Sequence, residues 1–236
     1  METTLIVTHI PKTAGTSLRI ALMEQFSPDA CFTVGDDIPS FKAKLSAMEP
    51  EAKSKIRLVF GHICYGWHKL LPQPCKYTTI LREPVSRVLS LYDYIMGSKT
   101  HYLHEVITRK HMTLKDFVTS GVTSTAENAM VRQLCGRDSF THVPYQDMAI
   151  PFGRVTTDEL SQAIYNLGQD FALVGTMDNF TGYMARLGEI LGVPLRTDVR
   201  ANTRTHTYRP TEDDIQAVIR HTRLDAALYS YAEGLQ

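Results

Sequence analysis

Residues 4–23 read TLIVTHIPKTAGTSLRIALM, and the rest of the architecture can be worked out from this pattern. Its first part, Thr4–Ile10, is short, apolar and rich in β-branched residues, which favours a buried strand. A turn containing Pro11 and Gly15 follows, and apolar residues from Leu18 onward have a helical spacing. The sequence therefore predicts a strand, a turn and a helix in direct succession.

The same pattern recurs further along the chain. Apolar stretches at Ile56–Phe60, Tyr77–Leu81 and Phe171–Val174 are each followed by a turn signal and a helical period. Strands of this kind that alternate with helices are typical of a parallel sheet flanked by helices on both faces. We expect a P-loop-like α/β fold in a single domain of 236 residues, with a helical excursion at about 97–123 where the sequence is polar and basic.

Three local signals predict where helices begin. Pro84 suits a first helical position, and Ser124 with Glu127 has the spacing of a capping box ahead of an apolar helix. Thr211 and the acidic residues after it predict the start of a last helical region, with Ile215, Val218 and Ile219 on one face.

Charge and cysteine content limit the class of protein. The chain has 25 basic and 25 acidic residues, so no long-range field attracts it to nucleic acid or to a membrane surface. Its four cysteines form neither a C-x-x-C pair nor a dense disulfide framework. The first apolar run is too short for a signal peptide or a membrane span. We expect a cytoplasmic protein without a nucleic-acid or membrane partner.

The first turn has the composition of an anion site. Lys12, Gly15 and the hydroxyl residues Thr13, Thr16 and Ser17 lie where a helix N-terminus offers unpaired N–H groups and a positive dipole end. In the loop of nucleotide triphosphatases the lysine follows the glycines, whereas here it precedes the glycine, which argues against ATP or GTP hydrolysis. Alternatively, the hydroxyl residues only cap the helix and the lysine is solvated.

A second crossing from strand to helix follows about 70 residues later. Arg82 ends the predicted strand, and its planar fork can bind a phosphate through two N–H groups. Ser90, two turns into the next helix, can share that phosphate. Alternatively, Arg82 pairs with a carboxylate and Ser90 is solvated. Two crossings of this type on one sheet favour a ligand with two separate anionic groups.

A histidine ends the predicted strand between these two crossings. Because ligands bind at the carboxyl ends of parallel strands, His62 is expected in the same crevice as Lys12, where a neutral imidazole can accept a proton from a hydroxyl. A purely structural role is the alternative. A metal site formed by His62 with Cys64, His68 and Cys75 is not expected, because their spacing fits no common zinc pattern.

Two motifs carry a resemblance to a known family. The string His-Ile-Pro-Lys-Thr-Ala-Gly-Thr-Ser at 9–17 resembles the 5′-phosphosulfate loop of the carbohydrate sulfotransferases that include heparan sulfate 2-O-sulfotransferases (sulfotransferase family 2). The segment 82–92, R-x-P-x-x-R-x-x-S-x-Y, resembles the family's 3′-phosphate segment. Segment 128–136 and later short runs follow the family's order, so the resemblance extends over most of the chain.

The resemblance implies a sulfotransferase fold and a donor, 3′-phosphoadenosine-5′-phosphosulfate (PAPS), used without a metal. It implies that His62 is the catalytic base and that Lys12 stabilises the leaving phosphate oxygen. The residues implied in donor binding are Pro11, Lys12, Thr13, Ala14, Gly15, Thr16, Ser17, Arg82 and Ser90. Arg204 is a further candidate for a contact with the nucleotide or the acceptor, and simple solvation of its side chain is the alternative.

The sequence also departs from the family. Its Golgi members carry an N-terminal anchor, whereas this sequence begins at its first predicted strand, which favours a bacterial-type soluble member with a sugar or small-metabolite hydroxyl as acceptor. An ATP-dependent kinase is the nearest alternative enzyme. It needs Mg²⁺ and a carboxylate at a strand end, for which Asp178 is the closest candidate. A non-catalytic nucleotide-binding module is the third possibility.

Overall fold

The computed structural model describes residues 3–35, 37–137, 150–198 and 208–235, and its centre is a five-stranded sheet. The strand order is β2-β3-β1-β4-β5, and all four neighbouring pairs are parallel. The strands are β1 (Thr4–Thr8), β2 (Cys31–Thr33), β3 (Leu58–Gly61), β4 (Cys75–Leu81) and β5 (Phe171–Thr176). Strand β2 was not predicted from the sequence. It has three residues, of which only Phe32 is buried, so it lacks the apolar run that marks the other strands.

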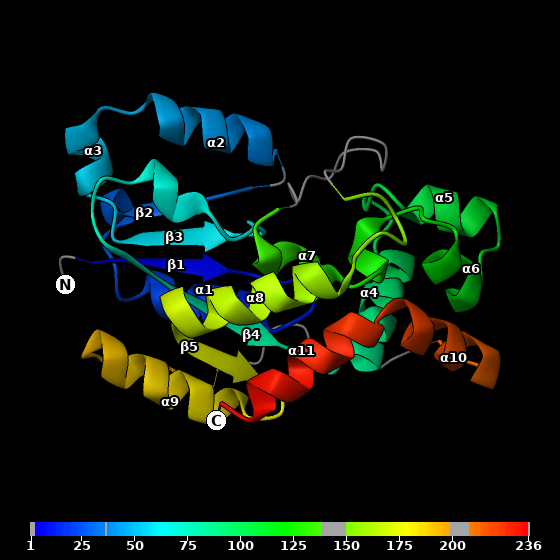
Figure 1. Cartoon of the computed structure of the whole chain (residues 1–236). Helices are drawn as coiled ribbons and strands as arrows, with labels where there is room; N and C mark the ends of the chain where they lie inside the picture. The colour runs from blue at the N-terminus through cyan, green and yellow to red at the C-terminus, as the bar shows by residue number, and fades with distance from the viewer. Residues whose placement is uncertain (1–2, 36, 138–149, 199–207, 236) are drawn as a thin grey trace.

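Helices cover both faces of this sheet (Figure 1). They are α1 (Gly15–Met23), α2 (Ile38–Ala47), α3 (Pro50–Ser54), α4 (Pro84–Gly97), α5 (His104–Arg109), α6 (Leu114–Thr119), α7 (Ala129–Cys135), α8 (Thr157–Asp170), α9 (Phe180–Leu191), α10 (Glu212–His221) and α11 (Arg223–Glu233). The predicted α/β fold, a parallel sheet flanked by helices, is confirmed. Among the described residues, no helix has both the length and the apolar character needed to cross a membrane.

Successive side chains of β1 point to opposite faces of the sheet and belong to two different core clusters. Leu5 and Val7 pack in one cluster with Leu22 of α1 and Met184 of α9. Ile6, between them, belongs to the cluster on the opposite face, which includes residues of α2. Because successive side chains of a strand point to opposite faces, a wholly apolar strand needs cover on both.

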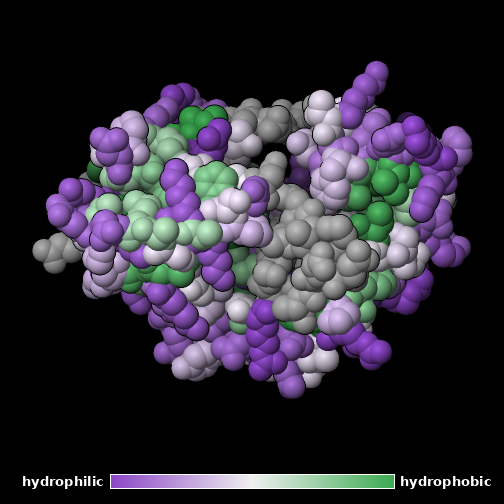
Figure 2. Space-filling view, turned by 90° about the horizontal axis from the view of Figure 1, so that it is seen from above, coloured by the Kyte–Doolittle hydropathy of each residue, from purple (hydrophilic) through white to green (hydrophobic). Residues whose placement is uncertain are grey.

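A helical layer lies beyond the carboxyl ends of the strands (Figure 1). Val88 and Ile95 of α4 pack in one buried cluster with Ile107 of α5, Phe117 of α6 and Val218 of α10. Residues 97–123 form α5 and α6 and no strand. Hydrophobic side chains also gather on the surface at the end of the molecule that carries α5 (Figure 2).

The helix-start predictions had mixed outcomes. Pro84 is the first residue of α4, and Thr211 forms a capping box with Asp214 at the start of α10, as predicted. The capping box at Ser124 is wrong. Ser124 lies in a 3-10 turn, and α7 begins only after Asn128. On the predicted apolar face of α10, Val218 is buried and Ile215 is partly buried, but Ile219 is 44 % exposed.

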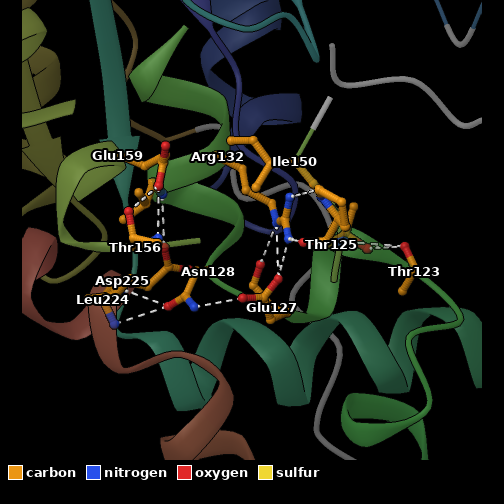
Figure 3. Close-up of polar contacts among 12 residues, drawn as sticks. Thr123, Thr125, Glu127, Asn128, Arg132, Ile150, Thr156, Glu159, Leu224 and Asp225 are labelled. Atoms are coloured by element: carbon orange, nitrogen blue, oxygen red, sulfur yellow. Dashed lines mark hydrogen bonds and ion pairs between the residues drawn. The ribbon is translucent and has the colours of Figure 1, made fainter. Parts of the chain in front are cut away.

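Glu127 forms a buried ion pair instead of a cap (Figure 3). The Arg132 guanidinium is fully buried, donates to both the carboxylate and the backbone carbonyl of Glu127, and donates to the Ile150 carbonyl at 2.7 Å. The Asn128 amide oxygen accepts from the N–H groups of Leu224 and Asp225 at 3.0 and 3.2 Å. The segment 128–136 therefore ties α7 to α11 through buried polar contacts.

Candidate functional site

The site predicted from sequence lies at the carboxyl ends of three adjacent strands, β3, β1 and β4. The chain leaves β1 toward β2 on one side of the sheet and leaves β4 toward β5 on the other. Ligands of open α/β sheets bind where the connections diverge in this way. The turns after β1 and β4 therefore border the expected crevice.

The turn between β1 and α1 has an unusual backbone. Lys12 and Ala14 adopt positive φ angles of 73° and 57°, although neither is a glycine. The Thr13 hydroxyl donates to the Ile10 carbonyl at 2.8 Å. Turns with such left-handed residues aim successive N–H groups at a common point, which makes a concave anion site. Left-handed non-glycine residues are strained and are concentrated at functional sites.

The N-terminus of α1 is not closed by a capping side chain. Its N-cap is Ala14, which makes no side-chain cap hydrogen bond in the described part of the chain. The Thr13 hydroxyl donates to a carbonyl of the turn instead of capping the helix. The alternative in which the hydroxyl residues only cap α1 therefore does not hold at the N-cap position. The positive end of the α1 dipole and Lys12 lie in the same turn.

Gly15 is needed because the turn folds back onto the ring of His9. A Cβ atom at position 15 would lie 1.7 Å from the His9 Nε2 atom, far inside any allowed contact. The His9 ring in turn stacks on His62, with ring centroids 4.3 Å apart and an interplanar angle of 26°. Burial, together with the nearby charges of His62, Lys12 and Arg19, lowers the pKa of His9 well below its ordinary value. His9 is therefore neutral near pH 7.

His62 lies beside the lysine turn, as the sequence predicted. It directly follows β3, whose Gly61 pairs with Thr8 of β1, and its Nδ1 atom is 2.9 Å from the His9 carbonyl oxygen. A carbonyl can only accept, so Nδ1 carries the hydrogen of this bond and the lone pair of the neutral ring is on Nε2. The imidazole and the Lys12 turn are thus at the same edge of the sheet.

Arg82 connects the second crossing to the first. Its Nη1 atom donates to the Lys12 carbonyl at 3.1 Å, so the residue after β4 contacts the turn after β1. Burial lowers the pKa of the guanidinium, while the charges of Glu83 and Asp178 oppose this shift. An arginine remains a cation despite such a shift.

Helix α4 carries two further residues at this edge. The Lys12 Nζ atom lies over the ring of Tyr94, 4.1 Å from its centroid. Ser90 precedes Tyr94 by one helical turn and shares its side of α4. Ser90 therefore lies on the side of α4 that carries the Tyr94 contact with Lys12.

The N-terminus of α4 is already satisfied by its own cap. Both carboxylate oxygens of Glu83 accept backbone hydrogen bonds, from Val85 at 2.8 Å and from Ser86 at 2.7 Å. A second anion at this crossing would therefore depend on side chains such as Arg82 and Ser90. Arg87, the other arginine of the same motif, is fully buried and lies 3.7 Å from the Asp225 carboxylate, so its role is structural.

Three further residues were named from the sequence: Arg204, Asp178 and His68. Arg204 is outside the described residues. Asp178, the candidate Mg²⁺ ligand of a kinase, is exposed and accepts a hydrogen bond from the Tyr229 hydroxyl at 2.8 Å. His68 bonds the Tyr77 hydroxyl at 2.9 Å, and within the described ranges no three His, Cys, Asp or Glu side chains form a cluster that could hold a metal ion.

Sequence reasoning missed His9, Tyr94 and Gln133. Gln133 of α7 is fully buried and donates to the carbonyls of His9 and Ile63. The contacts of these residues join positions far apart in the chain, so no local sequence pattern predicts them.

Comparisons with known proteins give a limited answer. The chain matches no protein-family model and no curated protein. Among solved structures it is similar to that of mouse sulfotransferase SULT7A1 complexed with PAP, with a TM-score of 0.46 and 13 % sequence identity. The similarity covers 96 % of this chain and 66 % of the mouse chain, so this chain spans about two thirds of that protein's length.

Proposed function

We propose that this protein is a PAPS-dependent sulfotransferase that transfers a sulfuryl group to an acceptor hydroxyl. One observation carries the proposal: His62 and Arg82 each hydrogen-bond a backbone carbonyl of the short segment between β1 and α1, His62 that of His9 and Arg82 that of Lys12. A cation, a base and a second cation from the ends of β1, β3 and β4 thus converge on one short turn.

The two crossings suit the two ends of the donor. PAPS carries a 5′-phosphosulfate and a separate 3′-phosphate. We assign the 5′ group to the turn formed by Pro11, Lys12, Thr13, Ala14, Gly15, Thr16 and Ser17, because it combines helix N–H groups with the Lys12 charge. We assign the 3′-phosphate to the side chains of Arg82 and Ser90. At this second crossing Glu83 already caps the N-terminus of α4, so the phosphate would be bound by side chains. Arg204 stays a predicted donor contact.

The proposed reaction is an in-line displacement at sulfur. The acceptor oxygen forms a bond to sulfur, and its proton passes to Nε2 of His62. The bond from sulfur to the bridging oxygen breaks, so the products are a sulfate ester and adenosine 3′,5′-bisphosphate. Lys12 stabilises the negative charge that develops on the departing phosphate oxygen, where one positioned donor contributes about 3 kcal/mol.

The family resemblance of the sequence supports the finer assignment. The motifs at 9–17 and 82–92 lie at the two turns that border the crevice between β1 and β4, where a nucleotide is expected. We propose a relative of the carbohydrate sulfotransferases whose acceptor is the hydroxyl of a sugar or small metabolite.

The test is a transfer assay with radiolabelled PAPS and a panel of sugars, phenols, lipids and small metabolites, run with a metal chelator present. We expect transfer to one class. Lys12→Met and His62→Asn should each lower kcat by roughly a hundredfold or more. Lys110→Met, an exposed lysine after α5, is the matched control and should retain full activity.

Two results would count against the proposal. Full activity of either site variant would remove that residue from the mechanism. Phosphoryl transfer from ATP with Mg²⁺, in the absence of sulfuryl transfer from PAPS, would favour a kinase instead.

A further inference from the structure

The side chain of Gln133 joins the two turns that flank the proposed base. It lies on α7, is 0 % exposed, and its Nε2 atom donates to the His9 carbonyl at 2.9 Å and to the Ile63 carbonyl at 3.0 Å. His9 follows β1, whereas Ile63 directly follows His62. Since both partners can only accept, the amide nitrogen must face them, and the orientation of the amide is fixed.

The His9 carbonyl oxygen receives a second hydrogen bond, from the Nδ1 atom of His62 at 2.9 Å. A carbonyl oxygen has two lone pairs, so this oxygen is fully occupied by Gln133 and His62. The bond requires a hydrogen on Nδ1. The isolated imidazole is free to place its proton on either nitrogen, so the partner of one nitrogen decides which of them keeps a lone pair.

Packing alone does not account for an amide at position 133. Its Oε1 atom is buried and has no hydrogen-bond partner among the described residues. A buried unsatisfied oxygen costs stability, and an unbranched apolar side chain of similar size would avoid that cost. What the amide supplies, and an apolar side chain cannot, is the pair of donor contacts to the carbonyls of His9 and Ile63.

We propose that Gln133 is a positioning residue that fixes the His9 carbonyl beneath His62 and thereby holds His62 as its Nδ1–H tautomer, with Nε2 facing the reaction. Gln133 donates to both carbonyl groups from α7, so one side chain links the two turns. The catalytic consequence rests on the proposed function, in which Nε2 takes the acceptor proton. The tautomer itself does not depend on that function.

The first experiment reads the tautomer in the free wild-type protein. Long-range ¹H–¹⁵N correlation spectra of histidine-labelled protein, recorded at about pH 8 so that the ring is neutral, distinguish a protonated ring nitrogen from an unprotonated one. The His62 signal is identified by its loss in His62→Asn. We expect protonated Nδ1 and unprotonated Nε2. The opposite tautomer in the wild type overturns the proposal.

The second experiment compares two variants that each lose a buried amide. Gln133→Met removes both donor contacts. Asn166→Leu is the matched control, because the buried Asn166 amide also donates to two backbone carbonyls, those of Leu134 and Cys135, at 2.8 and 3.2 Å. Both variants should unfold at lower temperature than the wild type.

Only Gln133→Met should change the His62 spectrum, to a mixture of tautomers, and only it should lower kcat, by about tenfold, with KM for PAPS unchanged. A Gln133→Met protein that folds and keeps a single Nδ1–H tautomer overturns the proposal. Lack of sulfuryl transfer by the wild type would defeat the proposed function but leave both spectroscopic results in force, so the two failures are distinguishable.

Discussion

At the scale of single residues, the site depends on how closely the lysine turn approaches the His9 ring. The His9 ring lies close against Gly15 and also contacts the rings of His62 and Phe60. A neutral His9 adds no charge next to the proposed base, and its carbonyl binds that base directly. The ring and the carbonyl of one residue thus hold His62 in place.

Gly15→Ala tests this arrangement. The new methyl group would lie 1.7 Å from His9 Nε2, so the ring has to move and its stack with His62 is disturbed. We expect at least a tenfold lower kcat and a loss of about 1–3 kcal/mol in the free energy of unfolding, as for other overpacked sites.

Gly168→Ala is the control for this substitution. Its Cβ atom would meet only the Tyr231 hydroxyl at 3.9 Å, an ordinary contact, and alanine favours a helix such as α8. Activity assays and urea unfolding of both variants check the prediction. Unchanged activity in Gly15→Ala would mean that the position of the His9 ring does not matter.

Some of these residues were accessible from sequence and others were not. Lys12, His62 and Arg82 each follow a predicted strand, and parallel strands bring their carboxyl ends to one edge, so their proximity could be inferred. Gln133 reaches the His9 carbonyl across 124 positions of the chain. Its role depends on how α7 packs, which no local pattern encodes.

At the scale of elements, α7 is anchored by a buried charge pair. Glu127 and Arg132 form their ion pair at 3 % and 0 % side-chain exposure. The sequence analysis assigned Glu127 to a helix cap, because its spacing from Ser124 fits a capping box. The tertiary contact with Arg132 prevailed, since a fully buried guanidinium requires a compensating carboxylate.

Removing the carboxylate from this pair should be costly. Glu127→Gln leaves the Arg132 charge buried without its counter-ion, and we expect a loss of about 3–5 kcal/mol in the free energy of unfolding. Glu51→Gln breaks the exposed pair of Glu51 with Lys55 and should leave stability unchanged within error. Urea unfolding measures both. Equal stability of the two variants would contradict the assignment.

Asp214 links α10 to α6 and makes stability depend on pH. Burial raises the pKa of Asp214, but hydrogen bonds from the N–H groups of Thr211 and Lys115 and from the hydroxyls of Thr211 and Tyr208 outweigh it, so the net pKa is lowered. A carboxylate with a lowered pKa stabilises the folded state above its unfolded pKa, and this contribution is lost as pH falls through the folded pKa.

Asp214→Asn should therefore be less stable than the wild type at about pH 7, and the difference in unfolding free energy should shrink toward about pH 3. Chemical denaturation of both proteins at several pH values provides the measurement. A difference that stays constant over this range would show that the carboxylate charge is not the source of the stabilisation.

At the scale of the whole molecule, strand order creates the site. The order β2-β3-β1-β4-β5 brings the ends of β3 and β4 to either side of β1, although the three strands are far apart in sequence. The alternation of apolar strands and helices was enough to predict this class of sheet. It was not enough to predict the edge strand β2 or the exposure of Ile219, because both depend on which neighbours happen to cover them.

The most direct test of the account is a crystal structure of the protein soaked with adenosine 3′,5′-bisphosphate. The account predicts one nucleotide across the ends of β1 and β4, with its 5′-phosphate on the turn at 11–17, its 3′-phosphate on Arg82 and Ser90, and His62 next to the 5′ end. A nucleotide bound elsewhere on the molecule, or bound with its two phosphates away from both turns, would contradict it.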